Sequence, residues 1–132
     1  MRRLLLLNFP YKKDAEGNVF PVIPLSINFR KKRRGFFALV DSGATVSIFR
    51  GEIADALGLK IEAGEEIFLG GVGGRIKGYL HKLEIEVGGK KFRCPIVFSR
   101  EYLVSFNLLG RKELFKKFRI IFEEKESRLR LE

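Results

Sequence analysis

Short apolar runs separated by glycine, proline and charged residues dominate the sequence. Residues 83–87 alternate apolar and charged side chains, and Gly88-Gly89 separates them from a second apolar run. Strict alternation is typical of a half-buried strand, and a Gly-Gly pair between two such runs predicts a hairpin. Comparable runs predict strands over residues 19–29, 36–40, 65–69, 75–87, 90–98, 118–122 and 128–131. The chain is therefore expected to be mostly β.

Helical spacing is confined to two short segments. Residues 50–57 carry apolar side chains at three- and four-residue spacing, and Gly58 follows as a typical helix stop. Residues 112–117 have the composition of a second short helix. Between two predicted strands, the glycine-rich stretch 70–74 predicts a turn.

A run of cations, Arg30 to Arg34, lies between two predicted strands, and we expect it in a hairpin turn. The uninterrupted apolar run Phe36–Val40 follows, which predicts a strand buried on both faces and places its aromatic residues in the core. Cations beside aromatic residues can bind nucleic acid by neutralising phosphates, although a solvated turn is the simpler interpretation.

Length and composition narrow the class of protein. The chain has 132 residues, which suits a single domain over 1–132, and 45% of them are hydrophobic. A single Cys and a single His exclude a disulfide framework, a Cys-based zinc site and most His-rich metal sites. The net charge of +10 admits nucleic acid or other acidic partners. On their strands, we expect His81 to face solvent and Cys94 to be a buried structural thiol.

The start of the chain imitates a secretory signal, but its apolar run ends after four leucines. A signal sequence needs a longer apolar region, so we interpret Met1–Asn8 as a strand. No segment approaches the ~20 apolar residues of a membrane helix. We therefore expect a cytoplasmic protein without a membrane partner, and the lone Cys94 fits a reducing compartment.

The acidic residue at the end of the apolar strand is unusual. Asp41 follows five apolar residues and precedes Ser42-Gly43, where glycine lets backbone N–H groups approach a carboxylate. An Asx turn that ends the strand is the plain structural alternative. The two other aspartates are expected elsewhere, Asp14 in a polar loop and Asp55 on a solvated helix face.

Three segments in order carry a resemblance to a known family. Asp41-Ser42-Gly43-Ala44 resembles the active-site motif of retropepsins, the retroviral-type aspartic proteases. Residues 70–77 are similar to the flap tip of these enzymes, and residues 107–111 look like the Gly-Arg turn that opens their C-terminal helix. The resemblance covers about 36–117. It implies an all-β, closed, barrel-like retropepsin (acid protease) fold with one or two short helices and a flap hairpin.

The same resemblance implies a homodimeric aspartic endopeptidase. Two carboxylates that share one proton and one water cannot both ionise, so one acts as base and the other as acid. The chain offers one suitable aspartate, so the second must be Asp41 of another copy at a two-fold axis. No metal or organic cofactor is implied. The partners expected are a second copy and an extended peptide or protein substrate.

The family roles transfer to individual positions. The catalytic residues are Asp41, which activates the water, Ser42, whose hydroxyl bonds across the dimer axis, and Gly43, whose carbonyl accepts from substrate. The substrate-binding residues are Ala44, Thr45, Gly71, Val72, Gly73 and Gly74. The structural residues near the site are Leu109, Gly110 and Arg111. Apolar lining is expected from Val40, Val46, Ile48 and Val72.

Some features depart from the family or leave alternatives open. Thr45 stands where retroviral enzymes often have an acid that pairs with the arginine equivalent to Arg111. Either Met1–Asn8 or residues 118–131 would supply the terminal strands of a dimer interface. A phosphate-binding loop at 70–74 is disfavoured because a strand follows it rather than a helix. A catalytically inactive module that binds peptide or nucleic acid on the same fold remains the alternative function.

Overall fold

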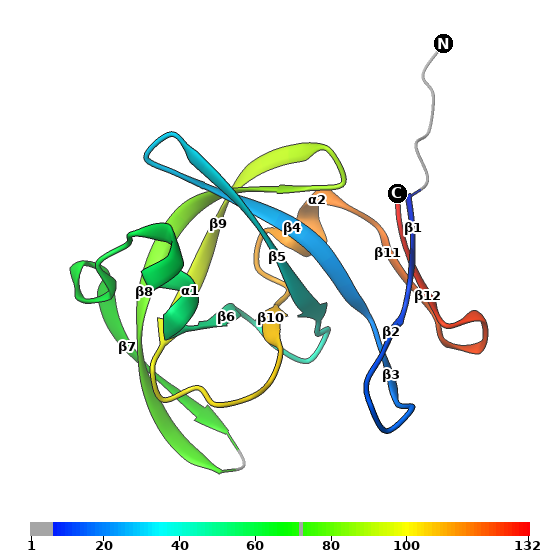
Figure 1. Ribbon diagram of the computed structural model, residues 1–132, viewed down its shortest axis with the longest axis horizontal. Coiled ribbons are helices and arrows are strands. Elements are labelled where there is room, and N and C mark those ends of the chain that lie inside the picture. Colours follow the sequence, from blue (N-terminus) through cyan, green and yellow to red (C-terminus); the bar gives the residue numbers. More distant parts are fainter. Residues whose placement is uncertain (1–6, 72) are drawn as a thin grey trace.

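The computed structural model describes residues 7–71 and 73–132, and strands make up most of it (Figure 1). The strands are β1 (Leu7–Pro10), β2 (Lys12–Lys13), β3 (Val19–Phe20), β4 (Val22–Phe29), β5 (Lys32–Val40), β6 (Ser47–Arg50), β7 (Glu65–Gly71), β8 (Gly74–Val87), β9 (Lys90–Ser99), β10 (Asn107–Leu109), β11 (Ile120–Glu123) and β12 (Arg128–Leu131). The helices are α1 (Gly51–Leu57) and α2 (Leu114–Lys117), with 3-10 turns at Ile61–Ala63 and Glu124–Glu126.

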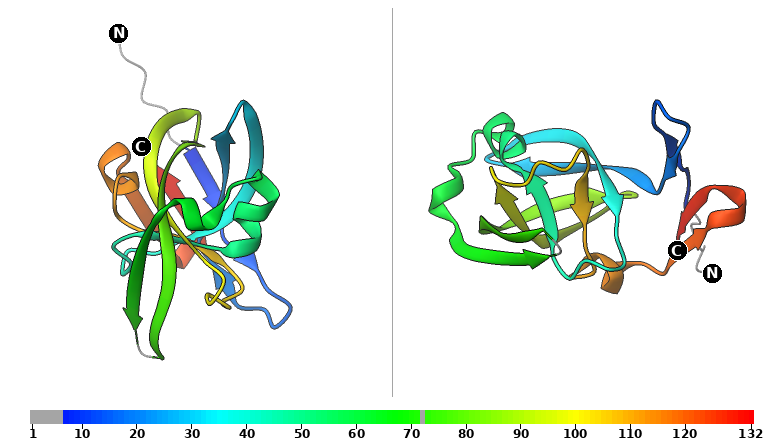
Figure 2. Two further views of the ribbon diagram at one scale, coloured as in Figure 1. Left: turned by 90° about the vertical axis from the view of Figure 1, so that its left-hand side faces the viewer. Right: turned by 90° about the horizontal axis from the view of Figure 1, so that it is seen from below.

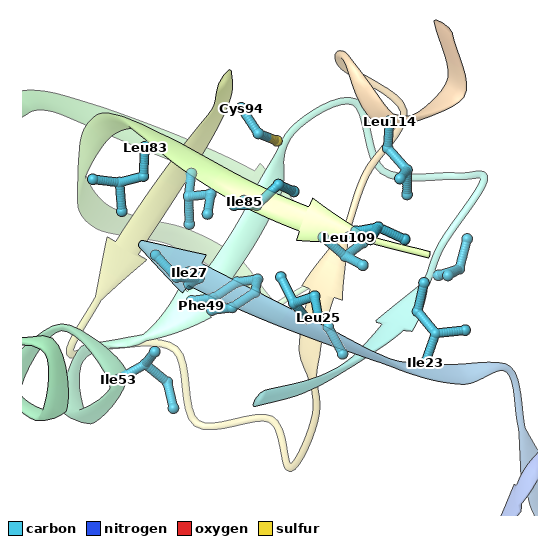
Figure 3. Packing of buried hydrophobic residues seen from close by; sticks show 14 of the residues in the cluster. Ile23, Leu25, Ile27, Phe49, Ile53, Leu83, Ile85, Cys94, Leu109 and Leu114 are labelled. Atoms are coloured by element: carbon cyan, nitrogen blue, oxygen red, sulfur yellow. The ribbon is translucent and has the colours of Figure 1, made fainter. Parts of the chain in front are cut away.

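The main sheet closes on itself. In the described part of the chain it has seven strands in the order β4-β5-β10-β6-β9-β8-β7, and β4 also pairs with β8. That extra pairing sets Ser26 opposite Glu86 and Asn28 opposite Glu84. Side chains alternate between the inside and the outside of such a ring. Its interior is filled by fully buried residues such as Ile27, Phe49 and Ile85 (Figure 3).

Two of the long hairpins in this sheet, β4–β5 and β8–β9, have the same type of turn with different residues. Gly88 and Gly89 connect β8 to β9 with φ of 55° and 81°. Arg30 and Lys31 connect β4 to β5 with φ of 49° and 66°, a left-handed conformation that residues with a Cβ seldom adopt. The expected turn over 30–34 was too long, because β5 begins at Lys32 and pairs it with Phe29.

The prediction that Phe36–Val40 is buried on both faces was wrong at its start. Ala38 and Val40 are in the core, but Phe37 is 53% exposed and Phe36 is half-buried. The reason is that β10 covers β5 only from Ala38 to Val40, so the preceding residues lack that neighbour. Phe37 instead contacts the Lys12 ammonium, which lies 4.0 Å from its ring centre.

The terminal strands form a second sheet within one chain (Figure 2). Its order in the described residues is β1-β12-β11, and one register row joins Leu7, Leu131 and Ile120. Leu129 and Leu131 are fully buried, so the apolar face of this sheet packs against the core. Both candidate terminal segments thus pair with each other. The expected strand Met1–Asn8 falls within the described residues only at Leu7 and Asn8, which belong to β1.

Other sequence expectations have mixed outcomes. Helix α1 ends at Gly58, whose φ of 72° is the left-handed conformation expected there. Cys94 is buried, as predicted. The expectation of a solvent-facing His81 was wrong, because its Nε2 lies 2.8 Å from the Ile61 carbonyl oxygen and its ring contacts Phe98 edge-on. Among the described residues, no helix has the length and apolar character needed to cross a membrane.

Candidate active site

Strand β10 lies between β5 and β6 and holds the loop that joins them. It runs parallel to β5, with Leu109 opposite Val40, and antiparallel to β6, with Leu108 opposite Ile48. At the end of β5, the Asp41 N–H donates to the Leu109 carbonyl at 2.9 Å. The carboxyl end of β5 and the carboxyl end of β10 therefore fix the backbone position of Asp41.

The Asp41 carboxylate is oriented by its own loop. The Gly43 N–H donates to Asp41 Oδ1 at 2.8 Å, and the Ala44 N–H donates to the Asp41 carbonyl at 3.2 Å. This is the Asx turn that the sequence offered as an alternative. Asp41 is half-buried, whereas Ser42 and Gly43 are exposed. The turn thus presents an oriented carboxylate at the surface and is compatible with a chemical role.

Residues 110–112 bind the other side of this loop. The Arg111 N–H donates to the Ala44 carbonyl and the Lys112 N–H to the Thr45 carbonyl, both at 2.9 Å. Gly110 donates to the Ser47 hydroxyl at 3.1 Å. A Cβ at Gly110 would collide with the Val46 carbonyl, so only glycine permits this approach.

The position of Thr45 has a direct consequence for Arg111. The Arg111 guanidinium lies 3.4 Å from the Thr45 hydroxyl, and this contact is exposed. A hydroxyl at that distance replaces the charged pair of the retroviral pattern with a weak hydrogen bond. Among the described residues, Arg111 forms no ion pair, and its backbone is what anchors the loop.

An apolar row crosses the sheet beside Asp41. Leu39 is opposite Leu108, Leu108 is opposite Ile48, and Ile48 is opposite Val97. Leu39 and Asp41 are two residues apart, so this row shares the face of Asp41. Its first three members are half-buried and therefore partly accessible.

This row corrects one expectation about apolar lining. Val40 is 2% exposed and belongs to the core, because it points to the opposite face from Leu39. Ile48 and Val46 are half-buried near the loop, as a lining role requires. Val72 lies outside the described residues. Leu39 and Leu108 were missed, although the alternation along each strand would have found them once the position of Asp41 was known.

The glycine-rich segment forms the end of a projecting hairpin (Figures 1 and 2). Gly71 is paired with Gly74, and the last pair between β8 and β9 is Tyr79 with Phe98. Between residue 78 and the turn at its tip, the hairpin is therefore held by strand pairing between β7 and β8 alone. Gly70, Gly71 and Gly73 have no non-neighbouring atom within 4 Å of an added Cβ, so the tip is open. We call residues 65–78 the flap.

The base of the flap is held by two side chains that the sequence did not identify. The Lys77 N–H donates to Glu101 Oε1 at 3.1 Å, and Ser99 Oγ donates to the Lys77 carbonyl at 2.6 Å. The Glu101 N–H donates to Ser99 Oγ at 3.1 Å. We call Ser99 and Glu101 the flap clamp. They give Lys77 the bonds that a neighbouring strand would give, just beyond the last β8–β9 pair.

A buried tyrosine lies near the site. Tyr102 is 8% exposed and donates to the Phe106 carbonyl at 2.8 Å. Burial raises its pKa, and the negative charge of Asp41 adds to that rise, while the Arg50 guanidinium opposes it. Its loop leads into β10, so Tyr102 orders the approach to the strand that holds Asp41.

The other two aspartates lie away from this loop. Asp14 accepts from the Glu16 and Asn18 N–H groups in an Asx turn, as expected for a polar loop. Asp55 is on α1 and pairs with both terminal nitrogens of Arg100 at 2.9 Å, and this hydrogen bonding lowers its pKa. Residues 7–71 and 73–132 contain no group of three or more His, Cys, Asp or Glu side chains placed to hold a metal ion.

Comparisons with known proteins agree with this geometry. The family model described as aspartyl protease matches residues 25–112, which include Asp41, the flap and Gly110. The chain therefore belongs to the aspartyl protease family. Its structure is similar to that of EIAV protease complexed with the inhibitor HBY-793, with a TM-score of 0.58 and 20% identity. The match covers 74% of this chain and 86% of that chain, and it confirms the predicted retropepsin-like fold. No curated protein matched the sequence.

Proposed function

We propose that the protein is a homodimeric aspartic endopeptidase whose two Asp41 carboxylates, one from each subunit, activate a water molecule. The observation that carries this proposal is the placement of Asp41 at the end of β5, oriented by the Gly43 N–H and the Leu109 carbonyl. Membership of the aspartyl protease family supports it. The water attacks the scissile carbonyl, with one Asp41 acting as base and the other as acid.

The dimer follows from the number of carboxylates that the reaction needs. Asp14 and Asp55 are engaged in other parts of the molecule. An isologous dimer places identical residues opposite each other at its axis, which would bring two copies of Asp41 together. The exposure of Ser42 and Gly43 supports this arrangement, because both remain accessible to a second subunit.

The residues around Asp41 have the following roles in this proposal. The Ser42 hydroxyl bonds across the axis, and the Gly43 carbonyl accepts from substrate. Ala44 and Thr45 bind the substrate backbone, together with the flap residues Gly71, Val72, Gly73 and Gly74. Leu109, Gly110 and Arg111 are positioning residues, because their backbone groups hold the loop that contains Asp41.

The proposed substrate is an extended peptide with apolar residues flanking the cut. Leu39, Leu108 and Ile48 form a partly accessible apolar row on the face of Asp41. Burial of an apolar substrate side chain on such a row contributes about 25 cal/mol for each Å² removed from water. Closure of the flap over the peptide would exclude water and position the scissile bond.

The decisive experiment compares the wild-type protein with Asp41→Asn on a denatured protein substrate between about pH 3 and 7, where carboxyl dyads work. We expect cleavage by the wild type and at least a ~10³-fold loss in Asp41→Asn, since an amide cannot serve as the base. Asp55→Asn is the matched control and should retain activity. Equal cleavage by wild type and Asp41→Asn would refute the proposal, and tight peptide binding without cleavage would favour an inactive binding module.

A further inference from the structure

The outward face of four neighbouring strands, β5, β4, β8 and β9, carries an excess of cations. Its exposed cations are Arg33 on β5, Lys82 on β8, and Lys91 and Arg93 on β9. Arg30 and Lys31, in the turn before β5, add two more. Register connects them, because Asn28 is opposite both Arg33 and Glu84, and Glu84 is opposite Arg93. We call these six residues the basic face.

The acidic residues on these strands, Glu84 and Glu86, are less exposed to solvent than the cations of the basic face. Glu86 accepts from Arg33 at 3.0 Å, and its side chain is only 18% exposed against 62% for Arg33. Glu84 is half-buried and accepts from the Asn28 amide at 2.7 Å. Two acids thus stand against six cations, and the cations project further into solvent. The face therefore presents a positive field to anything that approaches it.

The turn between β4 and β5 places its cations at a cost in conformational energy. Arg30 and Lys31 both have positive φ, whereas Gly88 and Gly89 form the same kind of turn in the hairpin of β8 and β9. Glycine or asparagine adopts this conformation far more readily than arginine or lysine. The chain therefore has charged side chains in a turn that glycine or asparagine would form at a lower conformational energy. Such a choice of residues is typical of a functional position rather than a structural one.

We propose that the basic face binds the phosphate backbone of nucleic acid without sequence preference. Flexible cations spaced over neighbouring strands neutralise several phosphates and release counterions. Cationic groups of this kind position a nucleic acid strand and read no bases. The turn at Arg30 and Lys31 precedes β5, whereas Asp41 follows the other end of this nine-residue strand. The turn between β4 and β5 also lies on the opposite side of the molecule from the flap (Figure 1), so nucleic acid bound at this turn would lie away from Asp41 and the flap. The proposal does not depend on peptide hydrolysis.

The test measures fluorescence anisotropy of a labelled single-stranded RNA of about 20 nucleotides, longer than a typical single-strand site. Salt is varied from about 50 to 200 mM. We expect affinity to fall steeply with salt for the full wild-type chain. The test variant, Arg30→Asn/Lys31→Gly, installs the residues that this turn prefers. Its melting temperature should rise. The slope of the logarithm of affinity against the logarithm of salt concentration should decrease in magnitude by about 1.4, at ~0.7 for each cation lost.

The matched control is Lys60→Gln/Lys125→Gln, which removes the same charge from exposed positions away from the basic face. It should retain the wild-type slope. An equal loss in this control would overturn the assignment to the basic face, as would salt-independent binding or no binding by the wild type. Polyglutamate that binds as tightly as the RNA would overturn the choice of nucleic acid in favour of an acidic protein. None of these results bears on the proposed protease function, which Asp41→Asn tests separately.

Discussion

Single residues decide whether the loop that contains Asp41 can form. The loop is held mainly through backbone groups, so residue identity matters where the backbone approaches closely. Gly110 is such a position, because an added Cβ would meet the Val46 carbonyl and lie 2.9 Å from the Ala44 carbonyl oxygen. Backbone atoms cannot move aside as a side chain can, so we expect little tolerance there.

We predict that Gly110→Ala destabilises the fold by about 1–3 kcal/mol, as overpacking of a buried site does. The free energy of unfolding in urea measures this change. Gly70→Ala is the control, because a Cβ at Gly70 has no atom within 4 Å. Similar stability of the two variants would contradict the steric argument.

The buried thiol predicts a dependence of stability on alkaline pH. Burial raises the pKa of Cys94 from 9.0 to about 11. The folded thiol thus stays neutral while the unfolded one ionises, so stability is full below about pH 9 and falls as pH rises toward 11. The unfolding free energy measured across this range should decline by up to roughly 2 kcal/mol.

The variant Cys94→Ala isolates this contribution to the pH profile. Its stability should fall less over the same range, because the titrating group is gone. Tyr11 adds a second contribution at higher pH, since burial and its hydrogen bond to Glu124 raise its pKa to about 12. An unchanged profile in Cys94→Ala would show that the thiol does not account for the decline.

At the scale of elements, the flap depends on a few contacts at its base. On the side of Tyr79 toward the tip, β9 no longer pairs with the hairpin, and the flap clamp of Ser99 and Glu101 holds Lys77 instead. The clamp also joins the flap to the loop that leads into β10. In the proposed enzyme, changes in that loop should therefore affect closure of the flap over a peptide.

We predict that Glu101→Ala loosens the flap. Loss of the bond to the Lys77 N–H should cost about 1 kcal/mol, and faster hydrogen exchange at that amide measures it directly. In the proposed enzyme, the KM for a peptide should rise about fivefold with a smaller change in kcat. Glu101→Gln retains an acceptor oxygen and should restore both values. No difference between the two variants would remove Glu101 from a role in positioning the flap.

The elements also show what the sequence could and could not predict. Asp41, the Gly-Gly hairpin and the helix stop at Gly58 were found because turns and strand ends have local chemical signals. The pairing of strand β10 with β5 and β6 was not predicted, since its three residues carry no local signal for the strands beside them. Phe37 and His81 were misjudged for a related reason, because a neighbouring segment decides their exposure.

At the scale of the whole molecule, the proposed chemistry needs two carboxylates, and Asp14 and Asp55 are engaged elsewhere, so a second copy would supply the partner of Asp41. The terminal strands pair with each other within one chain, and β1 and β11 are the outer strands of that sheet. Outer strands can accept further strands from a partner. Activity should therefore depend on protein concentration, rising as monomers associate.

Subunit mixing tests the shared pair of aspartates. A ninefold excess of Asp41→Asn should lower the activity of a fixed amount of wild type to about a tenth, because random association leaves few wild-type pairs. Sedimentation at the assay concentration should show the dimer. Undiminished activity in the mixture, with subunit exchange verified by labelled chains, would mean that each chain acts alone.

The hydrogen bonds between residues 41–47 and residues 109–112 also determine when the site forms during synthesis and folding of the chain. Ser47 and Gly110, which are hydrogen-bonded, are 63 residues apart in the chain. Such distant partners meet late, since closing a long loop precedes any gain from the contact. A chain still under synthesis has a complete Asp41 motif but nothing to hold it until residues 109–112 have emerged and folded. Nascent chains are therefore expected to be inert toward neighbouring proteins, with no separate inhibitory segment required.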